Sequence, residues 1–150
     1  EDFKEPNDII KYLGYDSVTS YVWVHHVEMP TFPTVEYMDM LKKMKEYWYE
    51  ASKSYSVPYY PNVTMGWDAS PRTIQSDVFD NIGYPFTSVY TNNTPENFQI
   101  ALEEAKKFLE EANLNILNIN AWNEWTEGTY LEPDTVNKYK YLEAIKNVFL

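Results

Sequence analysis

Hydrophobic and polar positions alternate over residues 17–24, and this period of two predicts a strand. One predicted face carries three valines and the other carries polar or aromatic side chains. The two sets are Val18, Val22 and Val24, and Thr19, Tyr21 and Trp23. Two further strands are predicted over residues 62–67 and 114–121, and a short strand is expected within residues 82–90.

Apolar residues recur at helical spacing in the segments between these strands. The first helix is expected to be capped by Thr34, with Glu36 in its first turn. A second begins at Thr94-Pro95-Glu96, a cap followed by proline and an acid, and ends near Asn113. A third is expected over residues 136–149, and a short helix over residues 7–13. The predicted buried stripes are Tyr37, Leu41, Met44, Trp48 and Ala51; Phe98, Leu102, Ala105, Leu109 and Ala112; and Leu142, Ile145 and Phe149.

Strands and helices alternate along the chain, which is typical of parallel strands joined by crossover helices. The 150 residues suit a single α/β unit covering residues 1–150. An eight-stranded α/β barrel has about 250 residues. The chain is therefore either an open α/β sheet or the C-terminal part of a larger barrel. No signal peptide is visible and residue 1 is Glu, so we expect a mature or trimmed piece.

Composition narrows the classes of partner. The net charge of −11 disfavours a nucleic-acid partner, because an acidic chain repels phosphate. The chain has no cysteine, which excludes disulfides, thiolate metal sites and cysteine nucleophiles. No apolar run reaches the roughly 20 residues of a membrane span, and no cofactor motif is present. The aromatic share of 17% suits flat, partly apolar ligands such as sugar rings.

The predicted third strand is the most informative segment. Asn118 and Asn120 share its face opposite Leu117 and Ile119, which indicates that this strand lines a polar cavity. The strand leads into Trp122-Asn123-Glu124-Trp125-Thr126-Glu127-Gly128. Ligands of parallel α/β folds bind at this end of the strands.

Glu124 and Glu127 are the candidate catalytic pair. Carboxylates three residues apart lie close together if the segment turns helically, and paired carboxylates are the groups that act at a glycosidic bond. One carboxylate can stay ionised while apolar tryptophan neighbours favour the protonated form of the other. Gly128 permits a sharp turn behind them. The alternatives are a solvated helix face for the glutamates and core packing for the tryptophans.

Several segments resemble a known family. Trp122-Asn123-Glu124-Trp125-Thr126-Glu127-Gly128-Thr129-Tyr130-Leu131-Glu132-Pro133-Asp134 resembles the signature of WbsX-type glycosyltransferases, also described as glycoside hydrolase family 99-like domains. Gly66-Trp67-Asp68 with Pro71-Arg72 is similar to a second signature. Thr94-Pro95-Glu96-Asn97-Phe98 and Tyr141-Leu142-Glu143-Ala144 are similar to further family segments, in matching order from about Leu13 to the C-terminus.

The resemblance implies a fold and roles for the pair. It implies a (β/α)8 TIM-type barrel, of which this chain would be the C-terminal half, with the N-terminal half or self-association completing the sheet. In the related endo-α-mannosidases the motif reads Glu-Trp-His-Glu-Gly-Thr. Carried over, Glu124 acts on the sugar 2-hydroxyl, aiding an epoxide-like intermediate, and Glu127 is the general acid/base. Thr126 stands where those enzymes have histidine, which leaves the sugar open.

Further residues are expected on the same rim as substrate-binding groups. Trp67, Asp68 and Arg72 follow the second strand and can stack on or hydrogen-bond to sugar; the alternative is a turn closed by an internal Asp68–Arg72 pair. Trp122, Asn123, Trp125 and Tyr130 complete the set. His25 and His26 lack further ligands at metal-binding spacing, so no metal is expected.

The sequence thus predicts a carbohydrate-active enzyme that cleaves or transfers glycosyl groups on an oligosaccharide or polysaccharide. Water and a second sugar both remain open as acceptors, and bacterial cytoplasm and secretion both remain open as compartments. The alternatives are a non-catalytic glycan-binding module that uses the same tryptophan-rich rim, and a stand-alone α/β domain with a structural acidic face.

Overall fold

The helices form where the sequence places apolar stripes at helical spacing. The computed structural model describes residues 5–150, and its helices are α1 (Pro6–Leu13), α2 (Tyr37–Ser54), α3 (Pro95–Glu111) and α4 (Lys140–Phe149). Every residue of the stripe predicted for α2 is buried. The stripe predicted for α3 is buried except for Ala112, which lies exposed beyond the end of the helix. Both long helices, and the short helix predicted near the N-terminus, are confirmed.

The two long helices begin in different ways. The Thr94 hydroxyl accepts a hydrogen bond from the backbone N–H of Asn97 at 3.3 Å, which confirms the predicted cap of α3. Thr34 does not cap α2, because residues Thr34–Glu36 form strand β2 and α2 begins at Tyr37. Strand β2 pairs in parallel with β5 (Val89–Thr91). The cap prediction was wrong because pairing with a distant segment outweighed the local signal.

The last helix is shorter than predicted and is rotated relative to the expected face. Asp134 accepts hydrogen bonds from the backbone N–H groups of Val136 and Asn137, and the turn so formed occupies the predicted first helical residues. The most buried residues of α4 are Ala144 and Val148. Leu142 and Ile145 are half-buried, and Phe149 is exposed. The predicted stripe of α4 is therefore only partly right: Ile145 packs against the core, but Ala144 and Val148 are more deeply buried than Leu142 and Phe149. The helix meets α3 also through Tyr141, whose ring lies 5.5 Å from that of Phe98.

Four short strands form two parallel pairs that pack against the helices. Strand β1 (Val18–Thr19) pairs with β3 (Tyr59–Tyr60), and β4 (Asn62–Thr64), one residue after β3, pairs with β6 (Asn118–Asn120). The predicted parallel arrangement is confirmed, although each strand is shorter than expected. Residues Trp23–His25 form a 3-10 turn, and Trp23 is buried together with Val22, which precedes the turn, so the predicted two-faced alternation fails there.

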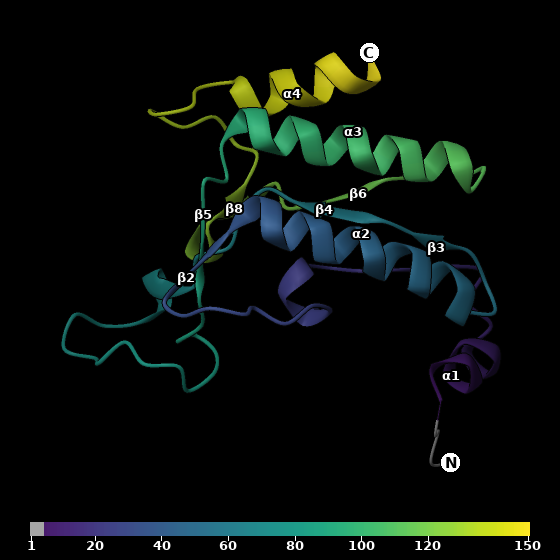
Figure 1. The fold of residues 1–150 in the computed structure, drawn as a ribbon, viewed down its shortest axis with the longest axis horizontal. Coiled ribbons are helices and arrows are strands. Elements are labelled where there is room, and N and C mark those ends of the chain that lie inside the picture. The colour runs from purple at the N-terminus through teal and green to yellow at the C-terminus, as the bar shows by residue number, and fades with distance from the viewer. Residues whose placement is uncertain (1–4) are drawn as a thin grey trace.

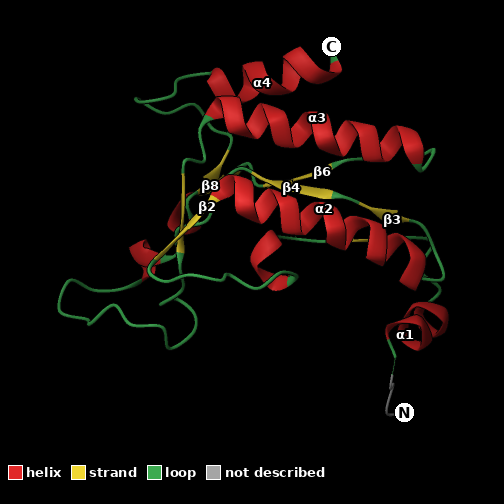
Figure 2. Ribbon diagram, viewed as in Figure 1, coloured by secondary structure: helices red, strands yellow, loops and turns green. Residues whose placement is uncertain are grey.

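Figure 1 shows α4, α3 and α2 in succession, with β3, β4 and β6 running along α2 and α3. The core lies between these helices and the strands, and its largest fully buried side chains include Trp23, Trp48, Phe98 and Phe108. Figure 2 shows short strands, short helical segments and long loops at the end of the molecule that bears β2 and β8. The α/β class is confirmed. Within residues 5–150 the strands form no closed sheet, so the half-barrel stays a prediction.

Candidate active site

The segments that follow β4 and β6 bring the predicted site residues together. After β4 the chain enters a 3-10 turn at Ser70–Arg72. After β6 it forms β7 (Asn123–Glu124), a 3-10 turn at Trp125–Glu127 and β8 (Thr129–Tyr130), with β7 and β8 antiparallel. Because β4 and β6 are parallel neighbours, both segments leave the sheet at the same end. The predicted common rim is confirmed.

Two glycines let the backbones of these segments approach closely. The N–H of Asp68 donates to the carbonyl oxygen of Glu127 at 2.7 Å. Gly128 has a φ of 64°, and a Cβ there would lie 2.9 Å from the Cβ of Asp68. A Cβ on Gly66 would lie 2.8 Å from the carbonyl oxygen of Gly128. Both contacts are too close for a side chain, so glycine is required at both positions.

Arg72 links the two candidate carboxylates. Its Nη2 lies 2.9 Å from Oε1 of Glu124, and its Nε lies 3.4 Å from Oε1 of Glu127. Asp68 is engaged elsewhere, since its Oδ1 accepts from the backbone N–H of Ser70 at 2.9 Å. Among the described residues the ion-pair partners of Arg72 are thus the two glutamates, and the internal Asp68–Arg72 pair does not form.

Tyr84 is a member of this site that the sequence did not reveal. Its hydroxyl donates to Oε1 of Glu127 at 2.9 Å, and its ring lies 6.0 Å from Cζ of Arg72. Desolvation, followed by the hydrogen bond to Glu127, raises the pKa of Tyr84, so its hydroxyl keeps its proton at neutral pH. Tyr84 stands in a loop with no fixed spacing to either motif, and only the tertiary fold identifies it. We call Arg72, Tyr84, Glu124 and Glu127 the Arg72 cluster.

The surroundings of the two carboxylates differ from the expected tryptophan environment. Trp125 stacks on Tyr130, with ring centroids 3.6 Å apart, and its N–H donates to Glu132 at 2.6 Å. The carboxylates instead have polar neighbours, including the Thr126 hydroxyl, which donates to Glu124 at 3.1 Å. The exposed fraction of the side chain is 34% for Glu124 and 13% for Glu127. Glu124 is therefore the more accessible carboxylate.

The other predicted substrate-binding residues take different positions. Trp67 is buried, and its N–H donates to the hydroxyl of Thr87 at 2.9 Å. Its ring lies 6.4 Å from that of Tyr84, so it packs beside the Arg72 cluster without offering an open face. Trp122 and Trp125 are exposed. Asn123 is paired with Tyr130 across β7 and β8.

Asp134 forms a second polar contact that holds the rim at Tyr130. The Tyr130 hydroxyl donates to Oδ2 of Asp134 at 3.3 Å. Burial acts to raise the pKa of Asp134, but backbone and side-chain hydrogen bonds from Val136, Asn137 and Tyr130 outweigh it and the pKa is lowered. Burial raises the pKa of Tyr130, as does the neighbouring Asp134. The aromatic pair of Trp125 and Tyr130 is therefore held by an ionised carboxylate at neutral pH.

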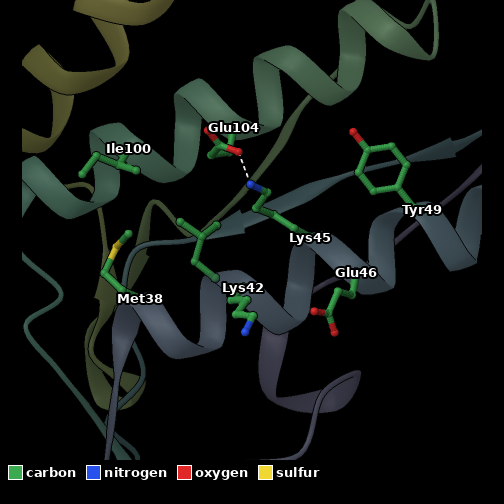
Figure 3. Close-up of a pocket in the computed structure, with 8 residues that line it drawn as sticks. Met38, Lys42, Lys45, Glu46, Tyr49, Ile100 and Glu104 are labelled. Carbon is green, nitrogen blue, oxygen red and sulfur yellow. Dashed lines mark hydrogen bonds and ion pairs between the residues drawn. The ribbon is translucent and has the colours of Figure 1, made fainter.

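A separate groove of about 510 Å³ lies between α2 and α3 (Figure 3). An ion pair between Lys45 and Glu104 spans it, as the dashed line shows. Hydrogen bonds from Lys107 and Lys45 lower the pKa of Glu104. None of the predicted site residues lines this groove. Its lining residues are Met38, Leu41, Lys42, Lys45, Glu46, Tyr49, Ile100 and Glu104.

The rings of His25 and His26 contact tyrosines that do not belong to the Arg72 cluster. The ring of His25 lies 6.3 Å from that of Tyr21, and the ring of His26 lies 4.8 Å from that of Tyr47. In residues 5–150 no group of three or more histidine, aspartate or glutamate side chains is arranged to hold a metal ion. Among the same residues, no helix combines the length and apolar character of a bilayer span.

Comparison with known proteins gives a family and several relatives. The family described as Glycosyltransferase WbsX matches residues 8–145. A protein described as uncharacterized protein WxcX, from Xanthomonas campestris pv. campestris, is 30% identical over 90 residues in each of two strains. Those matches cover 58% of this chain but only 12% of the relative's length.

A solved structure with a similar arrangement is the GH99 endo-alpha-mannosidase from Bacteriodes thetaiotaomicron. It is 14% identical to this chain, with a TM-score of 0.46, and the match covers 97% of this chain and 42% of that one. At that identity and TM-score, the likeness says nothing about the chemistry of this chain.

Proposed function

The chain belongs to the WbsX glycosyltransferase family, and from this premise we propose that it carries the reacting residues of an enzyme that cleaves or transfers glycosyl groups. Family membership supports the broad class, a carbohydrate-active enzyme. The reaction, the residues and their roles are our proposal. The matches cover only 12% of the relative's length, so the activity and substrates of the whole protein belong to the proposal as well.

The observation that carries the proposal is the position of Arg72. A single guanidinium contacts Glu124 and Glu127, and so joins the two segments that the sequence marked independently. Charged hydrogen bonds of this kind hold both carboxylates in fixed geometry at the end of the parallel strands. Two oriented carboxylates beside exposed aromatic rings are the groups that glycosyl chemistry requires.

In the proposed mechanism Glu127 is the general acid/base. It donates a proton to the departing glycosidic oxygen as the bond to C1 breaks, and it takes a proton from the acceptor hydroxyl as the new bond to C1 forms. Tyr84 orients it through their 2.9 Å hydrogen bond. Glu124, the more exposed carboxylate, accepts the proton of the sugar 2-hydroxyl as that oxygen bonds to C1, and returns the proton as the acceptor oxygen displaces it from C1. Sugar entry displaces part of the Arg72 contact and leaves Glu127 free to carry its proton.

The substrate is proposed to lie along the rim. Trp122 and Trp125 offer ring faces to sugar, with Tyr130 stacked behind Trp125. Asn123, Asp68 and Arg72 supply hydrogen-bonding groups. The buried Trp67 packs beside Tyr84 and so supports that part of the Arg72 cluster. The acidic chain, with a net charge of −11, favours a neutral or cationic glycan over a phosphorylated polymer.

We also propose that an N-terminal half of the barrel, or a second copy of this chain, covers the open edges of the central strands. Among the described residues, β1 is paired only with β3 and β6 only with β4. Unpaired strand edges promote association. Residues 1–150 produced alone should therefore aggregate or self-associate, and a monomer that unfolds cooperatively would contradict this.

The experiment measures turnover and glycan affinity on the full-length protein. Glu127→Gln keeps size and shape but cannot move a proton, so turnover should fall by about 10²–10⁴-fold while affinity stays within a few-fold. Glu124→Gln should also lose turnover, and a substrate lacking the 2-hydroxyl should react poorly with the unmodified enzyme. Glu143→Gln on α4, an exposed glutamate away from the cluster, is the matched control and should retain turnover.

A non-catalytic glycan-binding module is the second candidate, favoured by the exposed Trp122 and Trp125 and by the closed Arg72–glutamate contacts. The same measurement separates the two. Undiminished turnover in the Glu127→Gln protein would remove Glu127 from the catalytic role. Glycan affinity without measurable turnover in the unmodified protein would establish the binding module.

A further inference from the structure

A second polar site lies on the face of the central strands that points away from the helices. Val63 is fully buried in the core, and Ile119 is partly buried against it, so the asparagines that alternate with them along β4 and β6 belong to the other face. A pocket of about 290 Å³ lies on that face. The polar cavity predicted beside Asn118 and Asn120 is thereby confirmed. Its lining residues are Thr19, Ser20, Tyr21, Asn62, Asn118, Ile119, Asn120 and Ala121, and we call it the asparagine pocket.

Two buried amides in the asparagine pocket are only half satisfied. Asn62 is 1% exposed and Asn120 is 2% exposed. Nδ2 of Asn62 donates to the carbonyl oxygen of Asn118 at 3.5 Å, and Oδ1 of Asn120 accepts from the Thr64 hydroxyl at 2.9 Å. The remaining atoms, Oδ1 of Asn62 and Nδ2 of Asn120, have no hydrogen-bond partner within the described part of the chain. Folded proteins rarely leave such atoms unpaired.

The polar side chains around these two amides already have hydrogen-bond partners. Nδ2 of Asn118 donates to the Thr19 hydroxyl at 2.7 Å, and the Ser20 hydroxyl lies 2.7 Å from that of Tyr59. Tyr21 stands at the pocket with 54% of its surface exposed. No lining residue carries a charge. The wall of the pocket therefore contains one unpaired acceptor and one unpaired donor just beneath its surface, and an exposed aromatic ring stands at its edge.

We infer that the asparagine pocket binds one neutral sugar ring, as a glycan subsite that shares no lining residue with the Arg72 cluster. A sugar hydroxyl donates and accepts, so adjacent hydroxyls satisfy Oδ1 of Asn62 and Nδ2 of Asn120 together. The terminal torsion of asparagine is soft, and a small rotation turns each amide toward the pocket. The ligand class rests on the proposed function.

Size and charge agree with a single neutral ring. Small-molecule sites occupy about 300–1,000 Å³, and the asparagine pocket lies at the lower limit of that range. A ligand with a carboxylate or phosphate would find no cation among the lining residues. The exposed ring of Tyr21 supplies the apolar face on which the C–H groups of a sugar stack.

The test measures binding of glucose, galactose, mannose and glucuronate to the full-length protein by ligand-observed NMR titration. At least one neutral hexose should bind and glucuronate should bind more weakly. Asn120→Leu should raise the Kd of that hexose by about tenfold, the loss expected for one buried polar contact, and Tyr21→Ala should raise it by about three- to tenfold through loss of the stacking ring. Tyr15→Ala is the matched control, since Tyr15 has the same exposed fraction, 54%, and does not line the pocket. Tyr21→Ala changes an exposed side chain, so it remains informative if Asn120→Leu fails to fold.

An Arg72→Ala background separates the two sites. Hexose binding that persists in Arg72→Ala and is lost when Tyr21→Ala is added supports the asparagine pocket. Binding that disappears with Arg72→Ala and is unaffected by Tyr21→Ala and Asn120→Leu would overturn it, as would the absence of hexose binding to the unmodified protein. If the proposed reaction is wrong, the Glu127→Gln protein will keep full turnover. That result would not change the binding measurements at the asparagine pocket.

Discussion

The helical layer and the rim are held together by different interactions. Helices α2 and α3 meet through fully buried aromatic side chains, such as Trp48 and Phe108, with ring centroids 5.9 Å apart. The rim is joined by backbone contacts at glycine and by charged side chains that remain partly exposed to water, as in the Arg72–glutamate contacts. Apolar burial dominates folding energy, whereas exposed ion pairs contribute little.

Under the proposed function, this difference predicts that the free energy of unfolding depends mainly on the helical layer and turnover mainly on the rim. A change in the helical layer should alter the free energy of unfolding and leave the chemistry of folded molecules intact. A change in the Arg72 cluster should do the reverse. Gly128 lies between the two cases, because it shapes the backbone on which Glu127 stands.

The largest effect is expected in the helical layer. Phe98 is fully buried in α3, so Phe98→Ala should reduce the free energy of unfolding by about 3–5 kcal/mol through lost burial and the cavity left behind. Tyr139→Ala, at an exposed position, is the control and should change it by about 0.5 kcal/mol or less. Urea unfolding of the full-length protein measures both. A loss of turnover per folded molecule in Phe98→Ala would contradict the separation.

The next effect isolates the contact between the two rim segments. Gly14 and Gly128 both have positive φ values, 69° and 64°. A Cβ on Gly14 has no neighbour within 4 Å, whereas a Cβ on Gly128 meets Asp68. Gly14→Ala therefore introduces backbone strain alone, and Gly128→Ala adds a steric clash. We expect Gly128→Ala to cost about 1–3 kcal/mol, more than Gly14→Ala, and to reduce turnover as well. Equal costs in thermal unfolding would show that the close approach of Asp68 to Gly128 is unimportant.

A third substitution tests the geometry of Arg72 at constant charge. Arg72→Lys keeps the positive charge but loses the fork that reaches both carboxylates. Turnover should fall on the order of 10–100-fold through misplacement of Glu124 and Glu127, while the unfolding free energy stays within about 0.5 kcal/mol. Matched kinetics and unfolding curves provide the check. Unchanged turnover would mean that charge alone is sufficient at this position.

The smallest effect concerns the α2–α3 groove. Hydrogen bonds from Lys107 and Lys45 lower the pKa of Glu104 in the folded protein, so folding favours the ionised form. The resulting stabilisation is present at pH values above the unfolded pKa of about 4.3 and is lost as pH falls through the lower folded value. Glu104→Gln should remove it, at a cost of about 0.5 kcal/mol at pH 7. Unfolding at pH 7 and pH 3 should show a difference between the two proteins at pH 7 that is smaller at pH 3.

The sequence by itself determined the long helices and the chemical character of the rim. The apolar stripes of α2 and α3 and the Thr94 cap are local patterns, because a helix bonds its backbone within one segment. The motif from Trp122 to Gly128 is also one continuous segment. The sharp turn that ends it depends on Gly128 itself, whose φ is 64°. Asn118 and Asn120 indicated a polar cavity because strand alternation fixes which residues share a face.

Tertiary structure decided the strand lengths and the partners within the site. Thr34 reads locally as a helix cap, but β2 forms because residues 34–36 pair with residues 89–91. Arg72 and Glu124 are 52 residues apart in sequence, and Tyr84 and Glu127 are 43 apart. No local pattern records such contacts, since they depend on β4 and β6 lying parallel and on a loop returning to their ends. A strand and an ion pair both need a partner from another segment, and the fold alone supplies it.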